Sequence, residues 1–343
     1  MPDEKIRATG RRRVPEPIPR RSLRDTGTEA VRGIVLVCVC FFLLTVGDVA
    51  TIIALPAAGV VGAMLGRGAI GGLMVVALAL RHPEGDRRAA LRRLLPARGG
   101  LVLARSLVHS GATLTWYIAW QHGMALADSY ALAYAAPLLM ILLAVPMLGE
   151  RIGARRAIAT AVGFLGMLVM LRPGGDLWTP MSALLVLGVL GMAISRTSTR
   201  VLAATETPEC LAFWLMAFHV PVGLFMLLIG FPAPGLTWVA FGGLLMLGAS
   251  NGWAHWLHSR ASALAPVGAL APYEYTGMIW AVGLGYLTFA QVPSWGTLAG
   301  AAVVAAAGLS NFLGEHRRRR TERGVAGAAG TLPGVAVAQR SDQ

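Results

Sequence analysis

The sequence predicts an all-α integral membrane protein with ten transmembrane helices in two inverted five-helix repeats and with both termini in the cytoplasm. Three observations lead to this fold class. Of the 343 residues, 55% are hydrophobic and only 14% are charged, whereas soluble domains average roughly 25% charged residues. The Lys and Arg residues are concentrated in every second connection between the long apolar runs. Finally, a segment of the first half is echoed in the second half.

The apolar runs set the number of helices. A helix needs about 20 mostly apolar residues to cross the hydrocarbon core. Ten runs of this kind are joined by short connections, and they cover residues 33–54, 57–80, 100–120, 127–148, 154–171, 180–201, 211–230, 236–257, 267–290 and 295–313. The ends of the chain lack such runs, so residues 1–31 and 316–343 are predicted to be disordered basic cytoplasmic tails.

The Lys and Arg residues set the orientation. With the N-terminus inside, 27 of the 30 lie in cytoplasmic segments, Arg196 among them, and only Arg172 lies in an outer loop. Arg67 and Arg105 fall within predicted spans. One missed span would invert every later loop, so this bias predicts that both termini are cytoplasmic. The same rule explains the net charge of +13 without a nucleic-acid partner.

A weak internal repeat divides the chain. Residues 132–166 and 270–308 each contain a long span, a brief polar break and a span rich in small residues. Glu150 and Gln291 occupy the two breaks, and their separation gives five spans per unit. An odd number of spans inverts the second unit, an arrangement that recurs in secondary transporters. The predicted repeats are residues 32–174 and 175–315. The alternative is that any two spans rich in Leu, Ala and Gly look alike.

Three ionisable residues inside the predicted spans are candidates for substrate binding, because an unpaired charge in the bilayer is costly. Arg67 lies near mid-depth, where it forms an ion pair with Asp48 or clamps a substrate carboxylate. Glu274 lies between Tyr273 and Tyr275, where a carboxylate beside aromatic faces suits an organic cation. Glu274 is also a candidate proton carrier, and the alternative is a structural partner of Arg67 or of a tyrosine.

Other intramembrane side chains complete the candidate site. Trp116 and Tyr134 lie well inside the hydrocarbon zone and are expected to line a cavity. His109 and His219 also fall near mid-depth, although a lone His on an apolar helix is more often a packing residue. No metal-ligand spacing is present, and no glycine-rich nucleotide loop is present. We therefore expect neither a cofactor nor a metal.

Several short motifs, taken together, carry a resemblance to a known family. The first repeat holds Ala136-Pro137, Leu148-Gly149-Glu150-Arg151 and Gly163-Phe164-Leu165-Gly166, and the second holds Ala271-Pro272-Tyr273-Glu274-Tyr275-Thr276, Gly285-Tyr286 and Pro293. In order and spacing, residues 33–315 resemble the EamA-type drug/metabolite transporter superfamily. The pattern is similar to that of S-adenosylmethionine-type uptake transporters. One position departs from it, because Ala290-Gln291 stands where the family commonly has Gly-Glu.

The resemblance implies a secondary transporter in the bacterial inner membrane that moves a small metabolite by alternating access. An acidic residue in the Tyr-Glu-Tyr segment implies an amino-acid-derived, zwitterionic or cationic solute similar to S-adenosylmethionine. Expected partners are this metabolite, protons as a coupling ion, and membrane lipids, with the chain a monomer or a homodimer. The alternatives are a lipid or lipid-linked flippase or scaffold, and a membrane-embedded enzyme. The reactive constellation that an enzyme needs is not found in the sequence, so we expect no catalysis.

Overall fold

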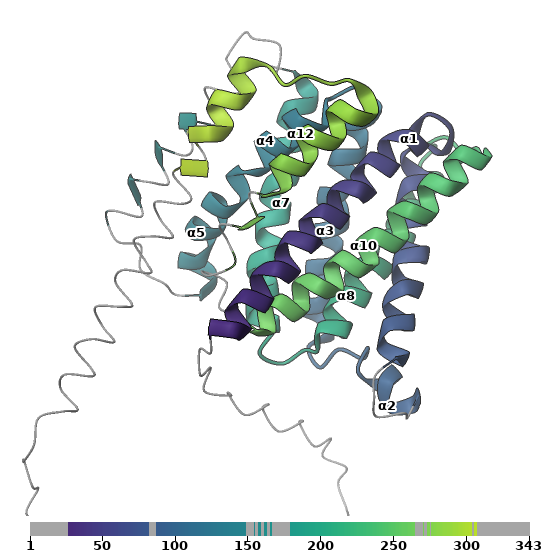
Figure 1. Ribbon diagram of the computed structural model, residues 1–343. Coiled ribbons are helices and arrows are strands. Elements are labelled where there is room, and N and C mark those ends of the chain that lie inside the picture. The colour runs from purple at the N-terminus through teal and green to yellow at the C-terminus, as the bar shows by residue number, and fades with distance from the viewer. Residues whose placement is uncertain are drawn as a thin grey trace, which may run out of the picture.

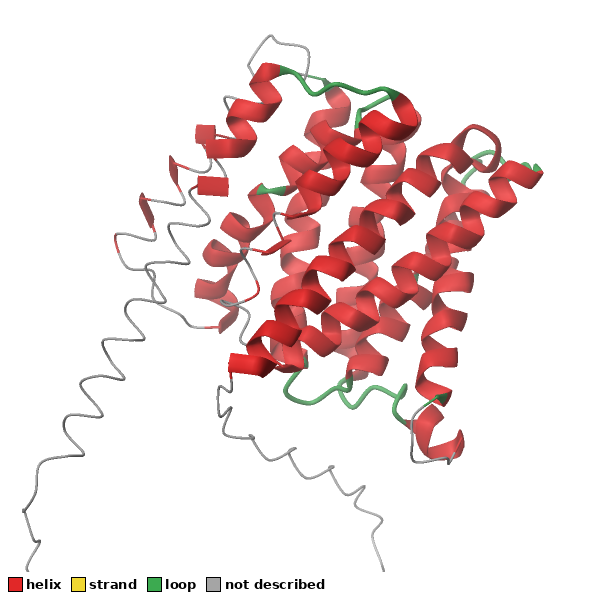
Figure 2. Ribbon diagram, in the orientation of Figure 1, coloured by secondary structure: helices red, strands yellow, loops and turns green. Residues whose placement is uncertain are grey.

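The computed structural model describes residues 27–81, 87–148 and 179–264, then 270, 273, 274, 276–303, 305 and 306, with isolated positions between 154 and 166. These residues form a bundle of helices (Figure 1). No strand occurs among them (Figure 2). The predicted tail 316–343 and residues 1–26 of the predicted tail 1–31 lie outside the described residues, as do Glu150 and most of the fifth predicted span. Residues 27–31 are helical and form the start of α1.

The first two predicted spans form one helical hairpin. Helix α1 runs from Gly27 to Leu80, and its helical geometry is interrupted at Gly59, where φ is 62° and ψ is 179°. A positive φ is readily adopted only by glycine. The chain doubles back there, so both ends of α1 lie at the same end of the bundle (Figure 1). The two halves of α1 are therefore the first and second spans.

Helix α10 (Trp238–Leu264) packs along both halves of α1. Small residues allow this close approach. A Cβ atom added to Gly252 would lie 2.7 Å from the carbonyl oxygen of Gly71, and one added to Gly47 would overlap the Asn251 side chain. Larger residues at these positions would force the two helices apart.

The remaining helices begin and end where the sequence has helix signals. Helix α3 spans Gly99–Gln121, and α7 spans Pro180–Leu202. Helix α8 (Pro208–Ala217) is followed by α9 (His219–Leu228). Thr179 and Thr207 cap α7 and α8, each accepting a hydrogen bond from a backbone N–H three residues later, with Pro at the first helical position. Pro221 lacks the N–H that would bond the Ala217 carbonyl, so the α8–α9 span is interrupted.

Shorter helices complete the bundle. Helix α2 (Arg87–Arg92) lies in the connection after α1. The fourth predicted span forms α4 (Leu126–Ala133) and α5 (Ala135–Leu148), which are separated at Tyr134. Helix α12 covers Thr276–Phe289, and residues 295–303 are helical. Every predicted span that the structure describes is helical, which fits ten transmembrane helices.

By length and composition, three helical stretches among the described residues could cross a membrane. They are 31–80, which contains the α1 hairpin, 180–199 and 208–228. Large apolar side chains remain exposed on the outside of the bundle, among them Leu73 at 69% and Leu228 at 84%. A bilayer accommodates such a surface, whereas water would not.

Hydrogen bonds join distant connections at opposite ends of the bundle. At one end, the Gly235 N–H donates to the Ala57 carbonyl at 3.0 Å. At the other end, the Glu206 carboxylate accepts from the N–H groups of Ala97 at 2.9 Å and Arg98 at 2.7 Å. Gln291 also bridges the halves, because its Oε1 accepts from the Leu126 N–H at 3.1 Å. The neutral amide of Gln291 thus caps the start of α4.

Candidate functional site

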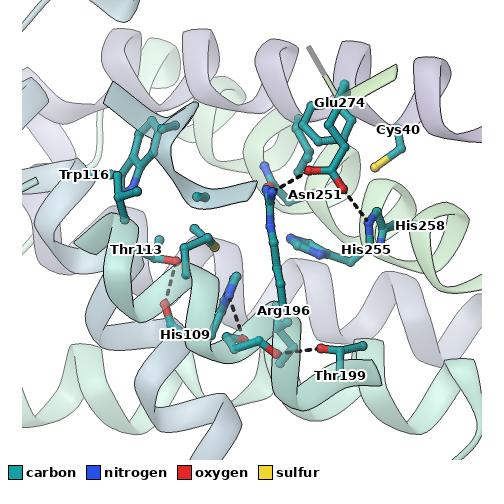
Figure 3. Close-up of a pocket in the computed structure, with 18 of the residues that line it drawn as sticks. Cys40, His109, Thr113, Trp116, Arg196, Thr199, Asn251, His255, His258 and Glu274 are labelled. Carbon is teal, nitrogen blue, oxygen red and sulfur yellow. Dashed lines mark hydrogen bonds and ion pairs between the residues drawn. The ribbon is translucent and has the colours of Figure 1, made fainter. Parts of the chain in front are cut away.

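A cavity of about 400 Å³ lies inside the bundle, within the usual size range of small-molecule sites. Side chains from α1, α3, α4, α5, α7, α8 and α10 line it, together with Leu270 and Glu274 (Figure 3). Its ionisable residues are Asp48, Arg67, Arg105, His109, Arg196, His255, His258 and Glu274. Charged residues from both halves of the chain therefore line the cavity.

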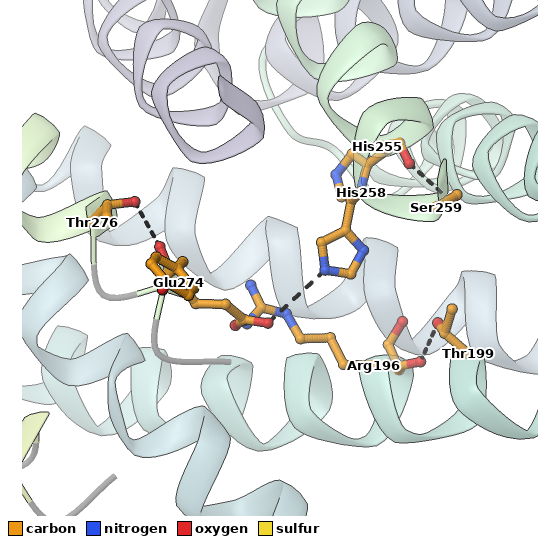
Figure 4. Close-up of polar contacts among 9 residues, drawn as sticks. Arg196, Thr199, His255, His258, Ser259, Glu274 and Thr276 are labelled. Atoms are coloured by element: carbon orange, nitrogen blue, oxygen red, sulfur yellow. Dashed lines mark hydrogen bonds and ion pairs between the residues drawn. The ribbon is translucent and has the colours of Figure 1, made fainter. Parts of the chain in front are cut away.

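One end of the cavity holds an ion pair. Arg196 Nη1 donates to Glu274 Oε2 at 2.7 Å, and His258 Nε2 lies 3.9 Å from Glu274 Oε1. Arg196 reaches out from α7, and His258 comes from α10 (Figure 4). The Arg196 guanidinium also lies over the Phe41 ring, 5.8 Å from its centroid. The Glu274 carboxylate is thus neutralised by groups of the protein itself.

This arrangement corrects part of the prediction for the Tyr-Glu-Tyr segment. Among the described residues Glu274 forms its ion pair with Arg196, and Arg67 does not lie within ion-pair distance of the Glu274 carboxylate. Tyr273 does not line the cavity and packs instead on the apolar cluster that contains Val37 and Leu257. Tyr275 lies outside the described residues.

The predicted ion pair between Asp48 and Arg67 does not form. Asp48 Oδ2 instead accepts a hydrogen bond from the Tyr130 hydroxyl at 2.7 Å. The same hydroxyl lies 3.1 Å from Thr45 Oγ1. Both Asp48 and Arg67 nevertheless line the cavity, as predicted candidates for a substrate site would.

Arg67 is 5% exposed, and among the described residues its two hydrogen-bonding contacts are with neutral groups. Its Nη1 donates to the Tyr117 hydroxyl at 3.3 Å, and its Nη2 lies 3.2 Å from His255 Nε2. Arginine offers only donors, so His255 Nε2 is the acceptor in this contact and His255 is neutral. The Nε atom of Arg67 has no partner among the described residues.

Three histidines form a cluster near Arg67, of which His109 and His219 are buried and His255 is half-buried. The ring centroid of His109 is 5.8 Å from that of His219 and 5.5 Å from that of His255. His219 Nδ1 donates to the Leu215 carbonyl at 2.8 Å, and Ser195 Oγ lies 3.4 Å from His109 Nδ1. His219 is a packing residue by these contacts, whereas His109 and His255 line the cavity. Within the described residues these side chains form no group suited to hold a metal.

Aromatic rings form one wall of the cavity. The ring centroid of Trp116 lies 5.5 Å from that of Trp120 and 6.0 Å from that of Tyr130, both in edge-to-face geometry. Tyr117 lies 5.9 Å from Trp120. Tyr134 lines the same cavity and is 7% exposed. Trp116 and Tyr134 therefore occupy the place that the sequence predicts for them.

Four arginine and histidine residues of the cavity were not predicted as site residues from the sequence: Arg105, Arg196, His255 and His258. Arg105 was placed within a span but given no role. Arg196 was counted among the cytoplasmic charges although it lies inside the predicted span 180–201. His255 and His258 are three residues apart near the end of the predicted span 236–257, a spacing that places both on one helix face. Helix α10 continues to Leu264, so both histidines are within it.

Comparison with known proteins gives the family. No family model matches the chain. A riboflavin transporter of Rhizobium johnstonii is 32% identical over 207 residues, which are 59% of this chain and 68% of that relative. The chain belongs to the EamA-type drug/metabolite transporter superfamily. The resemblance predicted from the sequence motifs is thereby confirmed.

Two further relatives extend the comparison. A riboflavin transporter of Brucella anthropi is 26% identical, covering 68% of this chain and 84% of that relative. An S-adenosylmethionine uptake transporter of Rickettsia prowazekii is 25% identical, covering 64% of this chain and 76% of that relative. This superfamily member is a multi-pass protein of the bacterial inner membrane.

A solved crystal structure shows the same fold. It superposes with a TM-score of 0.58 at 17% sequence identity, covering 83% of this chain and 96% of the other. At this identity the likeness concerns the fold alone. The helical bundle that surrounds the cavity is therefore also seen in an experimental structure.

Proposed function

We propose that this superfamily member is a secondary transporter that binds a small metabolite in the central cavity and moves it by alternating access. The observation that carries the proposal is the cavity itself, whose aromatic wall and buried charged residues come from both halves of the chain. A substrate held there contacts both halves, so a movement of one half against the other changes the side on which it is exposed.

The substrate class that fits the wall is a flat heteroaromatic compound with a polar tail. Trp116 and Tyr130 offer ring faces and edges for stacking, which favours such compounds. Riboflavin and S-adenosylmethionine, the substrates named for the relatives, both contain a flat ring system and a polar chain. An amino-acid-derived solute similar to S-adenosylmethionine belongs to this class. Its sulfonium would have to compete with Arg196 for Glu274.

The architecture proposed with this function is a pair of inverted repeats, 32–174 and 175–315, with cytoplasmic termini. The contacts at the two ends of the bundle support it. Glu206, between the sixth and seventh spans, binds the connection between the second and third spans. In inverted repeats the sixth and seventh spans correspond to the first and second, so a matching contact is expected between the connection after the seventh span and the connection after the first. The hydrogen bond from the Gly235 N–H to the Ala57 carbonyl joins these two connections.

Roles for individual residues follow from their positions. We assign substrate contact to Trp116, Tyr134 and Arg67, which line the cavity. Glu274, with Arg196 and His258, is the candidate for coupling to protons, because a carboxylate that exchanges partners can gain and lose a proton. Asp48 holds the Tyr130 ring in place through their hydrogen bond.

Counterflow in proteoliposomes tests the proposal without assuming a direction or an energy source. Vesicles are preloaded with unlabelled riboflavin, S-adenosylmethionine or amino acids, and the uptake of the labelled compound is followed. We expect accumulation with a heteroaromatic compound. Flat traces across the panel with folded protein would contradict the proposal.

A further inference from the structure

Four side chains that line the cavity bury a nitrogen that contacts no hydrogen-bond partner in the described part of the chain. These nitrogens are Arg67 Nε, Arg105 Nε, His109 Nε2 and Trp116 Nε1. The side chains are 5%, 6%, 2% and 9% exposed, respectively. Buried polar groups are seldom left without partners. The nitrogens of Arg67, Arg105 and Trp116 can only donate, so they indicate a ligand that supplies acceptors.

The positions of these residues form a continuous surface. Arg105, His109 and Trp116 lie on one face of α3, at spacings of four and seven residues, with Thr113 between them also lining the cavity. Arg67 reaches the same region from the second half of α1. Figure 3 shows His109, Thr113 and Trp116 at this side of the cavity, away from Glu274.

Neither arginine of this region forms an ion pair with a described residue. Arg67 contacts Tyr117 and His255, and Arg105 Nη1 donates to the Leu211 carbonyl at 3.0 Å. Among the described residues no carboxylate lies within ion-pair distance of either guanidinium. The two carboxylates of the cavity have other partners, since Glu274 binds Arg196 and Asp48 accepts from Tyr130. A buried charge without a counter-charge is costly, and an anion removes that cost.

We propose that Arg67 and Arg105, with His109, form an anion subsite that binds a carboxylate or phosphate group of the substrate. This inference rests on the proposed function and narrows its substrate class to heteroaromatic compounds with an anionic tail. The guanidinium forks donate to the anionic oxygens. The ring of the same substrate lies against Trp116, whose Nε1–H is free to donate to it. The subsite is separate from the Glu274–Arg196 pair.

Binding to the purified full-length chain in detergent tests the subsite with probes matched in shape and different in charge. Riboflavin 5′-phosphate is compared with riboflavin, and indole-3-acetate with indole-3-acetamide. We expect at least one anionic probe to bind ten or more times more tightly than its neutral partner. The phosphate and carboxylate pairs tell which group the subsite accepts.

Variants then locate the effect. Arg67→Gln and Arg105→Gln are expected to remove the preference for the anionic probe, and Arg67→Lys to retain part of it. Arg32→Gln, a charge removal at an exposed position near the start of α1, is expected to leave the preference unchanged. Thermal unfolding of each variant shows that the protein tested is folded.

Three results would overturn the subsite. The first is equal or tighter binding of both neutral probes by the folded wild-type protein, and the second is no binding of either anionic probe. The third is a preference for the anionic probe that survives in both Arg67→Gln and Arg105→Gln. Counterflow of a neutral solute combined with any of these results would leave the proposed function standing. A clear anion preference with flat counterflow traces would reject transport and retain the subsite.

Discussion

The two ends of the cavity differ in how their charges are balanced. At one end Glu274 is held by Arg196 at 2.7 Å, with His258 nearby. At the other end Arg67 lies among neutral groups, a hydroxyl and an imidazole. Both regions line the cavity and contain arginine, yet among the described residues only the first has its arginine in an ion pair without a ligand. We infer that the ion pair at the first end stabilises the bundle and that the second end binds the substrate.

Breaking the Glu274 end has the largest expected effect on stability. Glu274→Gln leaves Arg196 without its counter-charge and is expected to lower the free energy of unfolding by about 2 kcal/mol. A fully buried pair would lose about 3–5 kcal/mol, but the Arg196 side chain is 26% exposed. Unfolding in detergent measures the change.

The control is the double variant Glu274→Gln/Arg196→Gln, which removes both charges. It is expected to be more stable than Glu274→Gln alone. Equal stability of the two variants would mean that the pair contributes little, and the distinction between the two ends would be lost.

The hydrogen bond between Tyr130 and Asp48 has an intermediate expected effect. Tyr130→Phe removes the hydroxyl that donates to the Asp48 carboxylate, and bonds to charged groups contribute about 1.5 kcal/mol or somewhat more. A loss of about this size is expected in the free energy of unfolding. Tyr286→Phe is the matched control because Tyr286 is 60% exposed, and it should change nothing measurable.

Changing Arg67 has the smallest expected effect on stability. Arg67→Gln removes a buried charge that has no carboxylate partner, so the free energy of unfolding should stay within about 0.5 kcal/mol of the wild type or rise. Transport should nevertheless fall at least tenfold. A loss of stability as large as that of Glu274→Gln would show that the two ends are equivalent.

The helices were predictable from the sequence because spanning a bilayer demands a long apolar run, and runs such as 180–201 show this directly. The α1 hairpin was predictable for the same reason, since two spans, 33–54 and 57–80, were predicted there. The turn itself lies at Gly59, a few residues after the predicted break. The partners of the buried charges were not. Asp48 and Arg67 are on neighbouring spans, but helix rotation turns Asp48 towards Tyr130. Rotation is set by packing, for example of Gly47 against Asn251, which periodicity alone does not give.

Arg196 illustrates a different limit. A positive residue near the cytoplasmic end of a span fits the positive-inside rule, so the rule gave no reason to look for a partner. Its side chain extends into the cavity because Glu274 is there. Only the juxtaposition of α7 with residues 273–274, which lie far apart in the sequence, reveals the pair.

The proposed function requires that the substrate is bound against the aromatic wall of the cavity. Counterflow of labelled riboflavin and S-adenosylmethionine tests it most directly when wild type, Trp116→Ala and Trp238→Ala are compared at equal amounts of folded protein. Trp238 is 90% exposed and serves as the matched control. Trp116→Ala is expected to lose most of the accumulation and Trp238→Ala to keep it. Equal accumulation by Trp116→Ala and the wild type would show that the substrate is not bound against this wall.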